Sequence, residues 1–239
     1  MCIRDSYIGS DVTSKYSRRS PKEYYNIAYY LHEITRMRYG NYLIFFPSHS
    51  FLQSVFEVYE ENFLDPETEE CIIQEDIMSE EDREQFLSRF EGNRNCELED
   101  MIHMDIEVEE EKSLLGFCVM GGIFSEGIDL KNDSLIGAVI VGTGLPQVCN
   151  EREILKSYFD AAGKNGFDYA YRYPGMNKVL QAAGRVIRTS EDVGIVALLD
   201  DRFLNGAYQQ LFPREWEEYE VVTADRVARR VERFWDEWL

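Results

Sequence analysis

The sequence predicts an α/β protein with a mainly parallel sheet and helices on both faces of that sheet. Continuous apolar runs at residues 42–46, 114–120, 135–141 and 195–199 are typical of strands that are covered on both sides. Segments with the apolar spacing of helices separate these runs. Such alternation favours crossover connections, and these join parallel strands.

The composition is that of a globular protein, with 44% hydrophobic and 13% aromatic residues in a chain of 239. No apolar run approaches the roughly 18 residues of a membrane span, so no membrane partner is expected. The five cysteines are widely spaced and form no C-x-x-C pair. We therefore expect no disulfide framework, no metal site and a reducing, cytoplasmic location.

The acidic character of the chain is concentrated in one segment. The formal net charge is −20, and residues 61–120 hold 20 acidic and 4 basic residues, or −16 of that total. A block of like charge is usually a solvated face. Because phosphate contacts need Lys and Arg, this segment is not expected to hold DNA.

Helix signals occupy the first half of the chain. Ser20, followed by Pro21 and Glu23, predicts a helix start, with apolar spacing to about Arg38. A turn through Ser48 leads into a second helix. Residues 71–74 suggest a short strand, Ser79 with Asp82 predicts a helix through Phe90, and residues 91–112 read as a polar loop.

The remaining segments complete the domain. Residues 150–163 suit a helix, and residues 227–238 form an amphipathic one whose apolar stripe is expected in the core. Residues 1–19 show no period and are expected to be irregular, and Met1 to Ser6 look like translated adapter DNA. The predicted domain is therefore 20–239, with an acidic excursion at about 61–112.

A helix over residues 176–188 would carry an unusual cationic stripe. At 100° per residue, Gln181, Arg185 and Arg188 fall within about 60° of one another, opposite an apolar face. No acidic residue lies between Asp168 and Thr189. Two adjacent guanidinium groups repel, so the stripe indicates either a solvated basic face or a site for an anion.

A glycine-rich string follows the strand at 114–120. Gly121 and Gly122 are followed by Ser125, Glu126 and Asp129, at the carboxyl edge where open α/β sheets bind ligands. Asp200 and Arg202 end the last strand at the same edge. A purely structural glycine loop is the alternative.

Three segments in this order resemble motifs IV, V and VI of DinG/XPD-type superfamily 2 helicases. They are F-F-P-S at 45–48, G-G-I-F-S-E-G-I-D at 121–129, and Q-A-A-G-R-V-I-R at 181–188 before a strand that ends in D-D-R. The first is weak by itself. The resemblance implies the second RecA-like motor domain of an ATP-dependent DNA helicase.

The resemblance also implies roles for individual residues. In that family the motif VI arginines contact nucleotide phosphates, and motif V touches both DNA and nucleotide. The implied catalytic residues are Gln181, Arg185 and Arg188; the implied nucleotide-binding residues are Gly184, Glu126, Gly127, Asp129, Asp200 and Arg202; the implied DNA-binding residues are Ser48, Ser125, Gly121 and Gly122.

Several helicase features are missing from the sequence. There is no G-x-x-x-x-G-K-[ST] string, no D-E-x-H box and no cysteine quartet for an iron–sulfur cluster. We therefore expect a piece of a longer bacterial protein, without an iron–sulfur cluster. ATP and Mg²⁺ would be held mainly by an absent N-terminal RecA-like domain in cis. The chain alone should be inactive, and the partner of the whole protein should be single-stranded DNA.

One function of another class remains open. In a non-catalytic binding module, the arginine stripe would hold an anionic nucleic acid or protein, and the acidic block at 61–120 would bind a basic protein. Salt-sensitive DNA binding by the chain alone would favour this reading. A self-contained phosphotransferase is excluded for want of a phosphate-binding loop.

Overall fold

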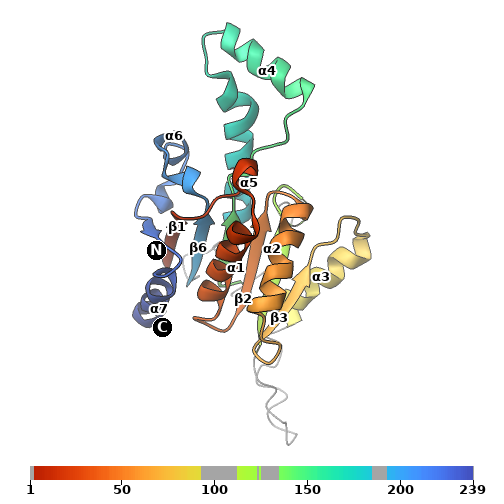
Figure 1. Ribbon diagram of the computed structural model, residues 1–239, viewed down its shortest axis with the longest axis vertical. Coiled ribbons are helices and arrows are strands. Elements are labelled where there is room, and N and C mark those ends of the chain that lie inside the picture. Colours follow the sequence, from red (N-terminus) through yellow and green to blue (C-terminus); the bar gives the residue numbers. More distant parts are fainter. Residues whose placement is uncertain (1–2, 93–111, 123, 125–134, 185–192, 239) are drawn as a thin grey trace, which may run out of the picture.

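The computed structural model describes residues 3–92, 112–122, 124, 135–184 and 193–238. Within them, seven parallel strands form one sheet in the order β3-β4-β2-β5-β6-β1-β7 (Figure 1). The predicted fold class is confirmed. The strands are β1 (Ile3–Gly9), β2 (Asn41–Phe46), β3 (Glu69–Ile73), β4 (Ser113–Val119), β5 (Gly137–Val141), β6 (Val193–Leu199) and β7 (Glu220–Val222).

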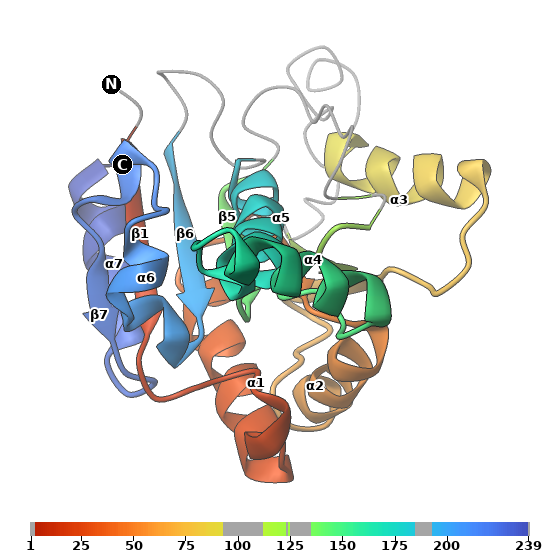
Figure 2. The ribbon, with the colours of Figure 1, turned by 90° about the horizontal axis from the view of Figure 1, so that it is seen from above.

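Helices cover both faces of the sheet because the central strands are apolar on both sides. Tyr42 and Ile44 of β2 pack in one core with α1 (Pro21–Thr35), α2 (His49–Asn62) and α7 (Val227–Trp238). Leu43 and Phe45 alternate with them and pack in the other core, with α3 (Glu80–Gly92) and α5 (Tyr173–Ala183). Figure 2 shows α1 and α2 together on one side of the molecule and α3 on the other.

Short elements complete the chain between the main helices. They are the 3-10 turns η1 (Tyr16–Arg18), η4 (Asp201–Leu204) and η5 (Arg214–Trp216), the π-helical turn η3 (Asp168–Arg172), and the helices α4 (Asn150–Ala161) and α6 (Gly206–Gln209).

The predicted helix starts are confirmed by their caps. The Ser20 hydroxyl accepts a hydrogen bond from the Glu23 amide at 3.3 Å, at the start of α1. At α3, the Asp82 amide donates to the Ser79 hydroxyl, and Asp82 accepts from the Ser79 amide in return. These bonds satisfy amide groups that the first turn of a helix leaves without a partner.

The expectation of an irregular stretch at residues 1–19 is wrong from Ile3 to Gly9. These residues form β1, which pairs with β6 along its whole length and with β7 at Tyr7 to Gly9. Tyr7 and Ile8 are buried. Asp5 and Ser6 interrupt the apolar pattern, so the strand is defined by its backbone pairing and not by its side chains.

The C-terminal helix packs into the core, as predicted. Val231 and Phe234 of α7 are almost fully buried, and Arg38 lies 5.0 Å from the ring centre of Trp235. In contrast, α4 buries none of its residues and projects from the body of the protein (Figure 1). Ile154 and Tyr158 of that helix are largely exposed.

The acidic excursion lies outside the described residues at 93–111. Its first part contains β3 and α3, and Lys112 follows the gap at 93–111. Among the residues that the structure describes, no helix is both long and apolar enough to cross a membrane.

Candidate functional site at the carboxyl edge of the sheet

The turns that follow the parallel strands all lie at one edge of the sheet. Because every pairing is parallel, Ser48 after β2, Gly121 after β4 and Asp200 after β6 come to the same edge. β2 lies between β4 and β5, and β6 is the next strand after β5. The sequence prediction that the glycine turn and Asp200 share one edge is confirmed, and Ser48 lies at the same edge.

Ser48 caps the helix that starts at this edge. Its hydroxyl accepts a hydrogen bond from the Phe51 amide at 3.3 Å and lies 3.3 Å from the hydroxyl of Ser50. The amide groups of the first turn of α2 therefore face the edge of the sheet. Helix N-termini of this kind favour negatively charged groups.

The glycine turn is described at its beginning only. Gly121 has a φ of +72°, a left-handed conformation that glycine adopts without strain. The Gly122 amide donates to the Val119 carbonyl at 3.2 Å and closes the turn. The other predicted residues of this string, Ser125, Glu126, Gly127 and Asp129, lie outside the described residues.

Helix α5 presents one face to the core and one to solvent, as the periodicity predicts. Met176 and Val179 are buried, whereas Asn177 and Gln181 are exposed. The helix extends from Tyr173 to Ala183 with Gly184 as an exposed C-cap. The predicted helix over 176–188 is confirmed from Met176 to Ala183, and its predicted continuation over 185–188 lies outside the described residues. The helix begins earlier, at Tyr173, because the π-helical turn η3 leads straight into it.

Arg185 and Arg188 lie outside the described residues. The structure therefore establishes the position of Gln181 on α5 but not the common stripe that the two arginines were predicted to share with it.

Close packing of two glycines positions the start of α5. Gly144, in the turn after β5, has a φ of +63°, and a Cβ added there would lie 2.6 Å from the Gly175 carbonyl oxygen. A Cβ on Gly175 would lie 2.7 Å from the Thr143 carbonyl oxygen. The backbone of α5 can therefore rest directly on the β5 turn, and this contact fixes the helix relative to the sheet edge.

Substitution of Gly144 by alanine should lower the free energy of unfolding by about 2–4 kcal/mol, because backbone strain adds to a clash with backbone atoms. Gly163 is the matched control: its φ is +74° and a Cβ there meets nothing within 4 Å. Gly163→Ala should cost only the strain, about 1 kcal/mol. Urea unfolding of both variants measures the difference. Equal losses would show that the Gly144–Gly175 contact does not stabilise the fold.

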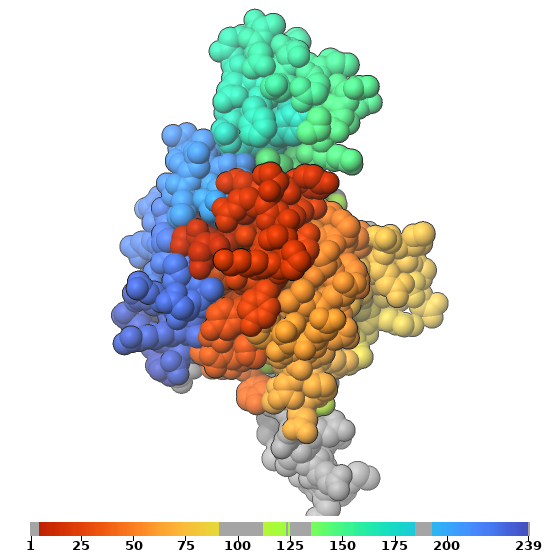
Figure 3. All heavy atoms as spheres, in the orientation of Figure 1, coloured from red at the N-terminus to blue at the C-terminus, as the bar shows by residue number. Residues whose placement is uncertain are grey.

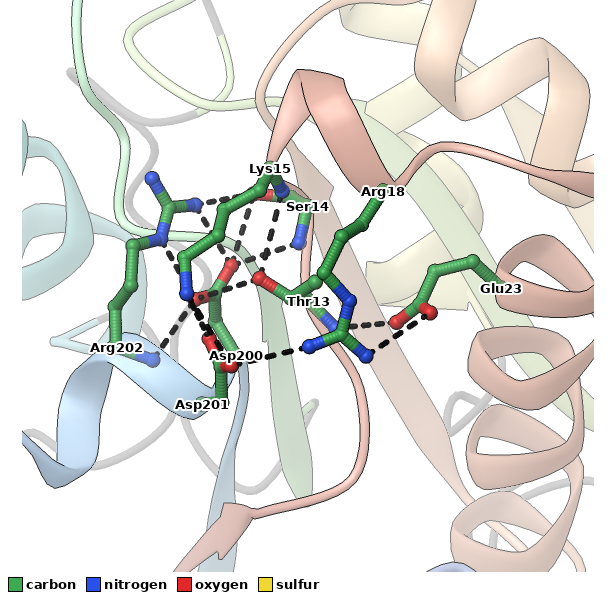
Figure 4. Close-up of polar contacts among 8 residues, drawn as sticks. All are labelled: Thr13, Ser14, Lys15, Arg18, Glu23, Asp200, Asp201 and Arg202. Carbon is green, nitrogen blue, oxygen red and sulfur yellow. Dashed lines mark hydrogen bonds and ion pairs between the residues drawn. The ribbon is translucent and has the colours of Figure 1, made fainter.

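Asp200 is the centre of a buried polar network (Figure 4). Arg202 donates to both of its oxygens at 2.7 Å, through Nε and Nη2. The amide and hydroxyl of Ser14 donate to Oδ2 at 2.8 and 3.0 Å, and the Thr13 hydroxyl donates to Oδ1 at 3.3 Å. Both carboxylate oxygens are thus engaged inside the protein.

The charge of Asp200 is stabilised by these donors. Burial opposes ionisation, but the hydrogen bonds and charge of Arg202, with the Ser14 amide, outweigh it and hold the pKa of Asp200 below its usual value. The observed role of the pair is to join the segment after β1 to the end of β6. The predicted nucleotide contacts of Asp200 and Arg202 remain predictions.

Ion pairs at the surface also hold the segment between β1 and α1 in place. Lys15 pairs with Asp201 at 3.0 Å, and Arg18 lies 3.3 Å from Asp201 and 3.7 Å from Glu23. The Glu23 carboxylate also accepts from the Thr13 amide at 2.5 Å. In the space-filling view this segment (red) lies at the foot of the α4 projection (Figure 3).

Sequence reasoning missed this segment as part of the edge. Arg19 lies over the ring of Phe51, 4.6 Å from its centre, and 5.4 Å from the ring centre of Tyr16. Tyr16 is 86% exposed. The signal available in the sequence was the cluster of Lys15, Arg18 and Arg19 just before the helix start at Pro21.

The comparisons with known proteins decide the family. The family of helicase C-terminal domains matches residues 31–219. The chain belongs to this family. This helicase C-terminal domain is 29% identical over 205 residues to "ATP-dependent DNA helicase XPD" of Sulfolobus acidocaldarius, covering 83% of this chain and 32% of that protein. It is 37% identical over 89 residues to "ATP-dependent DNA helicase DinG" of Photobacterium profundum, covering 36% of this chain and 13% of that protein.

Solved structures show the same fold. The structure named "XPD_APO" has a TM-score of 0.69 at 24% identity and covers 92% of this chain and 40% of its own. The C-terminal domain of the DEAD-box protein Dbp5 has a TM-score of 0.52 at 14% identity and covers 97% of both chains. This helicase domain thus spans about a third of its XPD relative from Sulfolobus acidocaldarius and nearly all of the solved C-terminal domain of Dbp5.

Proposed function

We propose that the chain is the second motor domain of an ATP-dependent DNA helicase and completes a nucleotide site whose phosphate-binding part lies on another domain. The single observation that carries this proposal is the placement of α5. The helix starts at the carboxyl edge, where Gly175 packs against Gly144, and it exposes Gln181 in a segment without acidic residues between Asp168 and Thr189. An anion can approach this face without meeting a carboxylate of that segment.

The site is incomplete for hydrolysis by itself. ATP, the substrate, needs a phosphate loop and a Mg²⁺ ion, and the sequence contains no phosphate loop. Among the described residues, no group of His, Cys, Asp and Glu side chains could hold a metal ion. The donor set of the described residues therefore does not fit Mg²⁺, and the first motor domain would hold the metal.

The role of this chain would be to stabilise charge and to position groups. Arg185 and Arg188 would approach the γ-phosphoryl group from across the cleft and stabilise the charge that develops there. Gln181 would orient an arginine or the attacking water. Gln181 is already held on α5, so little reorganisation of this residue would be needed during the reaction.

The DNA side of the site would use the other turns of the same edge. The first turn of α2, capped by Ser48, presents backbone amides there, and the left-handed turn at Gly121 lets the backbone come close to a ligand. Such amides suit the phosphates of single-stranded DNA. Opening and closing of the two motor domains would then move the protein along the bound single-stranded DNA.

The chain alone is expected to show no magnesium-dependent ATP hydrolysis, because it lacks the groups that hold the phosphates and the metal. Phosphate release by the purified chain, with and without single-stranded DNA, measures this. Turnover that Arg185→Ala abolishes would contradict the proposal.

The basic segment before α1 favours one alternative, a nucleic-acid-binding module without catalysis. Exposed Tyr16 and the neighbouring Arg19 offer a stacking surface and a cation. Tight, salt-sensitive binding of single-stranded DNA by the chain, unchanged when the first motor domain is joined to it, would support the module over the motor domain.

A further inference from the structure

The turn at Gly121 and Gly122 is held from two sides by side chains to which no role has been given so far. The first is Lys178 of α5. A Cβ added to Gly121 would lie 2.7 Å from Cε of Lys178, 2.9 Å from Cδ and 3.1 Å from Nζ. The end of the lysine side chain therefore occupies the space where any other residue at position 121 would begin its own side chain.

The second side chain belongs to Gln74, which directly follows β3 and is 7% exposed. The backbone amide of Gln74 donates a hydrogen bond to the Phe117 carbonyl at 2.8 Å. Its side-chain Oε1 accepts one from the backbone amide of Val119 at 2.9 Å. Nε2 of Gln74 lies 3.1 Å from the point where a Cβ on Gly122 would stand. Gln74 thus holds the last residue of β4 and lies against the turn that follows it.

Lys178 contacts Gly121 through the carbon atoms of its side chain. The residue makes no ion pair with any residue that the structure describes, so no salt bridge explains the position of its stem. Gln181 lies three residues further along the same helix, which places it one turn away on the same side of α5. Lys178 therefore connects α5, the helix proposed to face the nucleotide, with the glycine turn proposed to contact DNA.

We propose that Lys178 and Gln74 are positioning residues that transmit movement of α5 to the glycine turn. The inference rests on the proposed function, because it assigns the turn to DNA and the helix to nucleotide. When α5 shifts on closure of the motor domains, the Lys178 stem presses on Gly121, while Gln74 keeps the end of β4 in place. The shift is then passed to the residues after Gly122 and not absorbed by the turn.

The packing is tested on the chain alone by residue-resolved hydrogen exchange of the Gly122 amide. Lys178→Ala and Gln74→Ala should each speed exchange at least about fivefold, since each removes a support of the turn. Lys178→Met keeps an unbranched stem without the charge and should stay within about twofold of the parent protein. Unchanged exchange in Lys178→Ala, or equally fast exchange in Lys178→Met, would overturn the inference. Thermal unfolding of each variant shows that it is folded.

Coupling is tested in the protein that contains both motor domains. Lys178→Ala should lower kcat at saturating single-stranded DNA about tenfold, while KM for ATP changes less than about twofold. Lys178→Met should restore the rate, and Lys22→Ala, which removes an exposed lysine of α1, should leave it unchanged. A Lys178→Met rate as low as that of Lys178→Ala would mean that the ammonium binds a ligand directly, which contradicts a packing role.

The two tests separate the inference from the proposed function. A parent protein with both domains and no ATP turnover would contradict the proposed function. The exchange measurement on the chain alone would still decide whether Lys178 and Gln74 hold the turn.

Discussion

Replacement of Arg188 by alanine, in a protein that contains both motor domains, is expected to lower kcat for ATP hydrolysis by at least ~10². Arginine groups that stabilise a transferring phosphoryl group act in the transition state, so kcat should fall while binding of single-stranded DNA changes little. Arg188→Lys should not restore the rate, because an ammonium group lacks the planar fork of a guanidinium. Steady-state phosphate release at saturating ATP and DNA measures the effect.

Arg229→Ala is the matched control for Arg188→Ala. Arg229 is an exposed arginine of α7, and its loss should leave kcat unchanged. If Arg188→Ala weakened DNA binding as much as it slowed hydrolysis, the arginines of this segment would contact nucleic acid instead of the nucleotide. This result would contradict their proposed catalytic role.

The largest expected effect on stability follows from replacement of Asp200 by alanine. The carboxylate is fully buried and binds Arg202 through two hydrogen bonds, so its removal leaves a largely buried guanidinium without its partner. Breaking a buried pair in this way costs about 3–5 kcal/mol. Urea unfolding of the chain should show that loss, and Asp225→Ala, which removes an exposed carboxylate, should cost less than about 0.5 kcal/mol.

The same pair predicts a dependence of stability on pH. The pKa of Asp200 is lower in the folded protein than in the unfolded chain, where it is about 3.9. Its contribution is therefore fully present above that value and is lost as the pH falls through the lowered folded pKa. Asp200→Asn should remove this part of the acid dependence. An unchanged acid limb of the stability profile in Asp200→Asn would show that another group is responsible.

Helix starts with a capping residue and strands with a continuous apolar run could be predicted from the sequence. The cap at Ser20 and the buried run of β2 carry strong local signals, and both elements are found where they were expected. β1 and β7 could not be predicted in this way. β1 contains polar residues, and β7 has only three residues, so both are defined by pairing with distant strands.

The candidate site was predictable to a similar extent. Parallel strands place Ser48, Gly121 and Asp200 at one edge, and the periodicity of α5 placed Gln181 on its exposed face. The engagement of Asp200 by Ser14 joins residues that are 186 positions apart. No local pattern reports such a contact, and the segment before α1 was missed for the same reason.

The most direct test of the central claim compares ATP hydrolysis by three proteins: the first motor domain alone, this chain alone, and the two joined in one chain. The account predicts that the joined protein exceeds the sum of the separate domains by at least ~10² in kcat, because each half-site lacks groups that the other supplies. A joined protein that is no faster than its parts would contradict it, as would Arg185-dependent hydrolysis by this chain alone.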